Sequence, residues 1–190
     1  MTFDFTAARK NMVDSQVSTS DVTDPAILEA VRLVERERLC PPDKQSLAYA
    51  DTEVPCGGGR YLMRPREAAK LLQALRPRAG ERALAIAAPY VAAVLEAMGL
   101  EVTRLDDGDL AAPARGGYDV VVSEGAVTAT PPGWIAALGK GGRLAVVERN
   151  GPVGKARLYT KADHGVGARE VFDSTPPMLS GFEAKPHFAF

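Results

Sequence analysis

The sequence has little of the residues that would point directly to a metal site or a disulfide framework. Its 190 residues contain only two cysteines and two histidines. Cys40 and Cys56 are too few for a disulfide framework, and neither has a histidine at metal-ligand spacing. We therefore predict reduced thiols and no metal site, which fits an intracellular compartment.

Long apolar runs and an excess of one charge are missing as well. No run approaches the roughly 20 apolar residues of a membrane span, and residues 1–10 lack the apolar centre of a signal peptide. The formal net charge of −1 creates no field that would recruit nucleic acid or an anionic membrane. The sequence thus predicts a cytoplasmic protein without a nucleic-acid or membrane partner.

The chain is long enough to bury a core as a single structural unit, since 46% of its residues are hydrophobic. Helical spacing of apolar residues predicts a helix within residues 6–17. A second helix opens at Asp24-Pro25 and is expected to continue through Arg36 and Arg38, which fall on its polar side. Residues 40–63 hold several prolines and three consecutive glycines, and they read as irregular: a linker, or a lid across a cleft.

From residue 64 onward the pattern alternates between helix and strand. Helices are predicted over residues 64–75, from Pro89 to a cap at Gly99, and over 134–138. Short apolar strands are predicted at residues 82–87, 101–105, 118–123 and 143–147, followed by an antiparallel pair at 156–160 and 168–172. We expect residues 173–190, which are rich in proline and aromatic residues, to lie across the surface.

This alternation predicts an α/β fold, with a mainly parallel twisted sheet, helices on both faces and antiparallel C-terminal strands. Ligands of such sheets bind beyond the carboxyl ends of the strands. The candidate cleft residues at these ends are Ala87, Ala88, Tyr90, Asp106, Asp107, Gly108 and Glu124.

The order of several motifs resembles the protein-L-isoaspartate O-methyltransferase family. The run from Asn11 to Gln16 and the Thr23-Asp-Pro25 helix start are similar to the family's N-terminal region. Residues 48–51, 54–55 and 57–65 resemble its active-site segment, and residues 118–122 and 138–147 its fourth and fifth strands.

The resemblance implies a Rossmann-like methyltransferase fold that uses S-adenosylmethionine as methyl donor. The implied acceptor is the isoaspartyl carboxylate of a damaged protein or peptide. Methylation of this carboxylate allows the isoaspartyl residue to be repaired. It also implies an organisation in which residues 1–63, the N-terminal helices and an active-site-type loop, pack on a methyltransferase domain of residues 64–190.

The sequence departs from the family at the loop that should hold the cofactor. The family's first strand runs into an acidic residue and several glycines, which let the backbone approach the cofactor closely. Ala85 stands at the acidic position, every glycine is replaced in residues 85–90, and Pro89 lacks an N–H. We expect this loop not to hold the amino-acid end of the cofactor in the family's way.

Two further departures concern the acceptor site and the sheet. Met63 stands where the family has a serine, and a thioether cannot donate a hydrogen bond. A helix and a strand are deleted before Tyr118, so residues 101–105 are either the second or the third strand of the family's sheet. If they are the second, Asp106 or Asp107 could reach a ribose hydroxyl.

The remaining polar features have ordinary explanations that compete with functional ones. Glu124 could be a general base or a ligand-binding carboxylate, although a solvated glutamate at a strand end is the preferred reading. The run Gly57–Gly59 is interpreted as a turn rather than a phosphate loop, and Cys56 as a packed thiol rather than a nucleophile. Trp134 is expected to pack its helix on the sheet. Two groups of arginines are interpreted as solvated faces: Arg32, Arg36 and Arg38, and Arg60, Arg64 and Arg66. The second group could attract an anion.

Three hypotheses follow from the sequence. The preferred one is a family member that kept the fold, lost S-adenosylmethionine binding and methyl transfer, and now binds or assembles with another protein. The second is an active isoaspartyl methyltransferase with a rebuilt cofactor loop. The third is a module that binds another small molecule in a reshaped cleft. The aromatic tail, with Phe182, Phe188 and Phe190, could cover a groove or form a homodimer contact.

Overall fold

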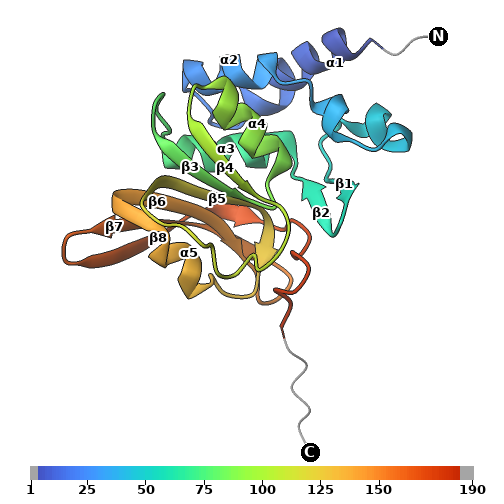
Figure 1. Cartoon of the computed structure of the whole chain (residues 1–190). Coiled ribbons are helices and arrows are strands. Elements are labelled where there is room, and N and C mark those ends of the chain that lie inside the picture. The colour runs from blue at the N-terminus through green and yellow to red at the C-terminus, as the bar shows by residue number, and fades with distance from the viewer. Residues whose placement is uncertain (1–3, 185–190) are drawn as a thin grey trace, which may run out of the picture.

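A computed structural model describes residues 4–184 of the chain, and its centre is a mixed β-sheet. Six strands lie in the order β4-β3-β5-β6-β7-β8 (Figure 1). The strands are β3 (Arg82–Ile86), β4 (Glu101–Leu105), β5 (Tyr118–Val127), β6 (Leu138–Glu148), β7 (Gly154–Ala162) and β8 (Gly165–Ser174). The first four strands in this order are parallel to their neighbours, whereas β7 and β8 are antiparallel. The predicted α/β fold with antiparallel C-terminal strands is confirmed.

The position of β4 decides which family strand it represents. It pairs in parallel with β3 alone, and β3 pairs with β5 on its other side. In doubly wound sheets the second strand lies beside the first, and the fourth lies on the first strand's opposite side. β4 therefore takes the place of the second strand, and the segment that would form the third is the loop of residues 106–117.

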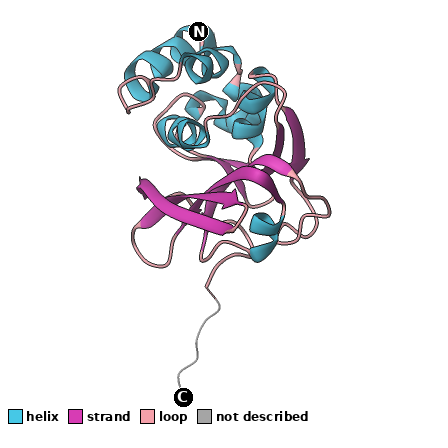
Figure 2. Cartoon of the chain, turned by 90° about the vertical axis from the view of Figure 1, so that its left-hand side faces the viewer, coloured by secondary structure: helices cyan, strands magenta, loops and turns pink. Residues whose placement is uncertain are grey.

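One face of the sheet carries most of the helices (Figure 2). They are α1 (Phe5–Met12), which continues as a π-helical turn (Val13–Val17), α2 (Pro25–Leu33), α3 (Pro65–Leu75) and α4 (Pro89–Ala97). The Asp24 carboxylate accepts a hydrogen bond of 2.9 Å from the Ala26 N–H and caps α2, as its place before Pro25 predicts. A single hydrophobic cluster joins these helices to alternate residues of the strands, such as Ile27 and Val31 with Val120 and Val122.

The opposite face is covered more thinly. It holds the short helix α5 (Pro132–Ala136) and a C-terminal segment, which pack on residues such as Leu84, Val121 and Leu144. The Trp134 side chain is buried there, and its indole N–H donates to the Leu110 carbonyl at 2.6 Å. The prediction that Trp134 packs its helix on the sheet is confirmed, and the ring lies 5.5 Å from that of Phe182.

The C-terminal segment packs against β5, whereas the sequence predicted only that residues 173–190 lie across the surface. The Leu179 N–H donates to the Ala126 carbonyl, the Ala126 N–H donates to the Pro177 carbonyl, and Leu179 is buried. Phe182 packs against this face, whereas Phe188 and Phe190 lie outside the described residues. No described helix has the length and apolar character needed to cross a membrane.

Three predicted elements differ from the structure. The second helix ends at Leu33, because Val34 adopts an extended conformation, and a 3-10 turn (Arg36–Leu39) follows. Residues 40–63 are not irregular throughout: they contain a 3-10 turn (Pro42–Leu47) and a hairpin of β1 (Val54–Gly57) and β2 (Arg60–Leu62). The strand that starts at Tyr118 does not stop at residue 123 but runs to Val127, so Glu124 lies inside it.

Candidate functional site at the β3–α4 turn

The turn between β3 and α4 is built from small apolar residues. Ala87 adopts a left-handed conformation with φ of 46°, which glycine adopts without steric cost. Its N–H donates to the Leu105 carbonyl at the end of β4, at 2.9 Å. Ala88 is the residue before α4 and offers no side chain to cap it. The backbone thus keeps a glycine-type turn although it contains no glycine.

The carboxylate of Glu124 lies at the amino end of α4. One oxygen accepts the N–H groups of Tyr90 and Val91, at 2.7 and 3.0 Å, and the other accepts the Met63 N–H at 3.1 Å. The amino end of a helix has free N–H groups and a partial positive charge, and it commonly binds anions. Here that anion is part of the protein itself.

Glu124 is fully buried, and the prediction of a solvated strand-end glutamate is wrong. Burial raises the pKa of Glu124 to about 6, whereas Arg36 and the three backbone N–H groups act in the opposite direction. The reason for the wrong prediction is that β5 continues past Ser123 and carries Glu124 under the helical layer.

Arg36 is the functional-site residue that the sequence did not predict. Its side chain is fully buried rather than solvated, and its guanidinium lies 4.4 Å from the centre of the Tyr90 ring. It donates to the carbonyl of Ala48 at 2.6 Å and to that of Met63. No sequence signal marked it, because its burial follows from the break of α2 at Leu33, which turns the next residues inward.

Met63 connects the β1–β2 hairpin to this cluster through its backbone. The side chain is fully buried, the N–H donates to Glu124, and the carbonyl accepts from Arg36. Tyr90, Arg36 and Glu124 are therefore buried together between β2, α4 and β5. Of the predicted cleft residues, Ala88, Tyr90 and Glu124 lie there, whereas Ala87 packs in the hydrophobic cluster of the opposite face, and all four are buried.

The other predicted cleft residues lie at the end of β4. Asp107 and Gly108 are exposed, whereas the Asp106 carboxylate forms an ion pair of 3.3 Å with Arg60 of the hairpin. The three glycines before Arg60, Gly57 to Gly59, form the turn of this hairpin. All three have positive φ angles, as their interpretation as a turn predicts. The hairpin thus reaches across to the strand end that could contact a ribose.

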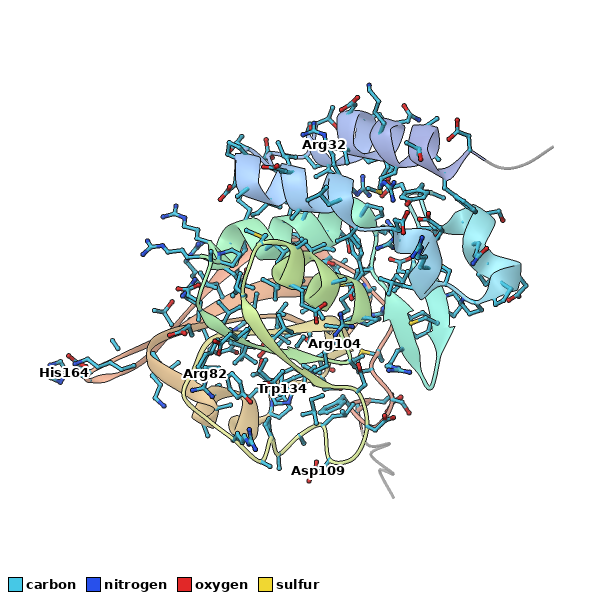
Figure 3. All side chains as sticks on the ribbon, turned by 45° about the horizontal axis from the view of Figure 1, so that its top comes forward. Arg32, Arg82, Arg104, Asp109, Trp134 and His164 are labelled. Carbon is cyan, nitrogen blue, oxygen red and sulfur yellow. The ribbon has the colours of Figure 1, made fainter. Side chains whose placement is uncertain are left out.

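The cysteine and histidine side chains that the structure describes, for which the sequence predicts no catalytic role, lie away from any arrangement that would activate them. Cys56 is half-buried, and burial together with the nearby Glu124 raises its thiol pKa to about 11, which disfavours a thiolate nucleophile. His164 lies at the tip of the β7–β8 hairpin, far from the turn (Figure 3), and His187 lies outside the described residues. Within residues 4–184, no group of three or more His, Cys, Asp and Glu side chains could hold a metal ion.

Three cavities among the described residues lie away from this turn. They are lined by residues of α3, the segment before α2, the segment between α3 and β3, and the strands β5 to β8. None of their lining residues belongs to residues 87–90, and none is Glu124.

Comparison with known sequences identifies one family. The family model of protein-L-isoaspartate(D-aspartate) O-methyltransferase (PCMT) matches residues 7–105. A protein-L-isoaspartate O-methyltransferase of Methylorubrum populi is 30% identical, over 94% of this chain and 98% of its own length. Protein-L-isoaspartate O-methyltransferase 1 of Rhodopseudomonas palustris is 40% identical, over 54% of this chain and 42% of its own length.

Solved structures show the same fold. A protein-L-isoaspartate O-methyltransferase structure matches 91% of this chain and 66% of its own, with a TM-score of 0.72 and 20% identity. A Plasmodium falciparum protein described as a beta-aspartate methyltransferase (PCMT), in complex with S-adenosyl-L-homocysteine, matches 94% of this chain with a TM-score of 0.70 and 12% identity.

Proposed function

We propose a loss of cofactor binding and methyl transfer in this chain, which belongs to the protein-L-isoaspartate O-methyltransferase family, whose members depend on S-adenosylmethionine. We propose that it now acts in the cytoplasm as a binding protein on the methyltransferase fold. The observation that carries the proposal is the Glu124 carboxylate at the amino end of α4.

The residues at the β3–α4 turn do not fit the amino-acid end of the cofactor. A ligand carboxylate at this helix end would need N–H groups that Glu124 already accepts, and it would face the negative charge of Glu124. Ala87 and Ala88 are buried, so the loop backbone offers no open surface for close approach. Arg36 and Tyr90 lie against each other in the adjoining space. Binding of the cofactor would therefore require the side chains of Glu124, Arg36 and Tyr90 to move.

The two remaining parts of a methyltransferase site are altered as well. Asp106, at the position that could reach a ribose, is paired with Arg60, so a ligand hydroxyl would compete with a cation for this carboxylate. Met63, at the position of the family's serine, offers neither a hydroxyl nor an exposed side chain. These two observations support the proposal independently of Glu124.

An active isoaspartyl methyltransferase is the second candidate. The observation that favours it is the similarity to the Methylorubrum populi relative across nearly the whole chain. Its substrate would be a protein or peptide that contains isoaspartate. For this activity the turn would have to open by displacing Glu124, and the acceptor carboxylate would have to be activated without a hydroxyl from residue 63.

A methyl-transfer assay separates the two candidates. The full chain is incubated with isotopically labelled S-adenosylmethionine and an isoaspartyl peptide, with an active relative assayed in parallel. We expect no label in the peptide above the level without enzyme. Transfer of label at a rate within about tenfold of the relative would contradict the loss of activity.

The proposed partner class is a second protein, and a second copy of this chain is one such partner. Light scattering of the purified chain tests the homodimer. A mass of one chain at micromolar concentration would leave a different protein as the partner.

A further inference from the structure

The largest of the three cavities has a volume of about 720 Å³ and lies at the opposite end of the sheet from the β3–α4 turn. It is formed where the end of α3 meets β8 and the segment before α2. A neighbouring cavity of about 470 Å³ shares Arg76, Arg78 and Arg169 with it and extends toward the starts of β3 and β5. Volumes of this size are typical of sites for small molecules.

Four cations line the larger cavity without forming an ion pair in the part of the chain that the structure describes. Lys70, Arg76, Arg78 and Arg169 line it, and none of them forms an ion pair within the described residues. The acids that line it are Asp21 and Asp24, of which Asp24 caps α2, and the charge of Arg78 also acts on Glu81 of the neighbouring cavity. In contrast, Arg143 in the neighbouring cavity is neutralised by Glu81, at 2.9 Å. The larger cavity is thus a concave surface on which four cations face two lining acids.

Arg76 occupies a backbone position that favours glycine. It ends α3 in a left-handed conformation, with φ of 48° and ψ of 58°. The end of the helix does not need this side chain, because Arg143 donates to the carbonyls of both Leu75 and Arg76, at 2.7 and 2.8 Å. Arg76 therefore occupies a strained position, and its charge serves neither the helix end nor an ion pair.

The cavity also has an apolar part. Val171 and Phe172 of β8 line it together with Pro25 and Pro77. The Lys70 ammonium lies 4.6 Å from the centre of the Phe172 ring, which places a cation beside an apolar wall. A ligand that fits would combine several negative charges with a flat apolar group. Arginine guanidinium groups bind phosphate oxygens in pairs, which favours phosphate as the source of the charge.

We propose that this cavity binds a small organic molecule that carries two or more phosphate groups, with the phosphates on Arg76, Arg78 and Arg169 and the apolar group near Phe172. The inference goes beyond the proposed function, because the cavity shares no lining residue with the β3–α4 turn. It holds whether or not the chain transfers methyl groups.

Calorimetric titration of the full chain with adenosine diphosphate tests the proposal. Pyrophosphate, citrate and adenosine are titrated in parallel to separate phosphate charge, carboxylate charge and the apolar group. We expect adenosine diphosphate to bind with a Kd below about 1 mM, more tightly than any of the other three. No binding at this level, or citrate binding as tightly, would overturn the assignment.

Two variants locate the binding. Arg76→Gly removes the guanidinium and places at the left-handed position the residue best suited to it, so the melting temperature should not fall. We expect it to weaken adenosine diphosphate binding about tenfold, while Arg38→Ala, which removes an exposed cation that lines none of the three cavities, changes it less than about twofold. A loss below about fivefold in Arg76→Gly, or an equal loss in Arg38→Ala, would refute the site.

Discussion

Replacing Glu124 by alanine removes the carboxylate from the amino end of α4. The N–H groups of Met63, Tyr90 and Val91 then lose their acceptor, and Arg36 loses a negative charge that favours its burial. Since all these groups lie under the helical layer, the substitution should lower the free energy of unfolding of the whole domain and not only loosen a local loop.

The expected cost can be worked out from these contacts. Each buried N–H left without an acceptor costs about 1–3 kcal/mol, so three give about 3–9 kcal/mol. Relief of the buried charge offsets part of this, because a pKa raised from 4.5 to about 6 corresponds to about 2 kcal/mol at neutral pH. Water entering the vacated space satisfies some of the N–H groups. We therefore expect a net destabilisation of about 2–5 kcal/mol.

Urea unfolding at pH 7 measures this difference in the free energy of unfolding. Glu35→Ala is the matched control, since it removes an exposed carboxylate whose ion pair with Arg38 is at the surface. The control should change stability by less than about 1 kcal/mol. A Glu124→Ala variant that is as stable as the control would refute the assignment of Glu124 as the internal anion of α4.

The same residue predicts a pH dependence with a defined sign. Because burial raises the pKa of Glu124 in the folded state, the folded protein binds more protons than the unfolded chain between pH 4.5 and about 6. The contribution of Glu124 is therefore present in full below pH 4.5 and is lost as the pH rises through about 6. Urea unfolding at pH 5 and pH 7 should show this fall in the wild type relative to Glu124→Ala. An identical pH profile of the two proteins would contradict the raised pKa.

Three further substitutions and modifications test other parts of the structure. Arg143→Ala removes the ion pair with Glu81 and two hydrogen bonds to the end of α3, and it should lower the free energy of unfolding in urea by about 2 kcal/mol. An unchanged midpoint of urea unfolding would show that Arg143 does not stabilise this helix end. Gly125→Ala places a Cβ 2.6 Å from Leu179 at a φ of 134°, so it should cost about 3 kcal/mol by the same assay, and a neutral effect would show that the C-terminal segment is not packed there. The Cys56 thiol, with a pKa of about 11, should react with a thiol reagent at pH 8 at least about 100-fold more slowly in the folded than in the unfolded chain, and equal rates would disprove its burial.

The sequence predicted the elements whose signals are local. The start of α3 at Pro65, the strand at residues 82–86 and the end of α4 before Gly99 follow from proline, apolar runs and glycine, which act within a few residues. The antiparallel pair of β7 and β8 was predicted for the same reason, although both strands are longer than their apolar centres. The missing glycines of the β3–α4 turn could be read directly from the chain.

What replaces those glycines could not be predicted, because it depends on contacts between distant segments. Glu124, Met63 and Tyr90 meet although they lie up to 61 residues apart. Arg36 was read as solvated because its neighbours in the chain are charged, and only the break of α2 turns it inward. The sequence could show that the family's cofactor loop is altered, but not that a glutamate and an arginine occupy its surroundings.

The central claim is that the β3–α4 turn is closed to the cofactor by the protein's own side chains. Calorimetric titration of the folded chain with S-adenosyl-L-homocysteine tests it most directly. We expect no heat of binding at millimolar ligand, while circular dichroism confirms that the chain is folded. Binding with a Kd near 1 μM, about −8 kcal/mol, would contradict the account, because it would require Glu124 and Arg36 to leave the positions that they hold in this structure.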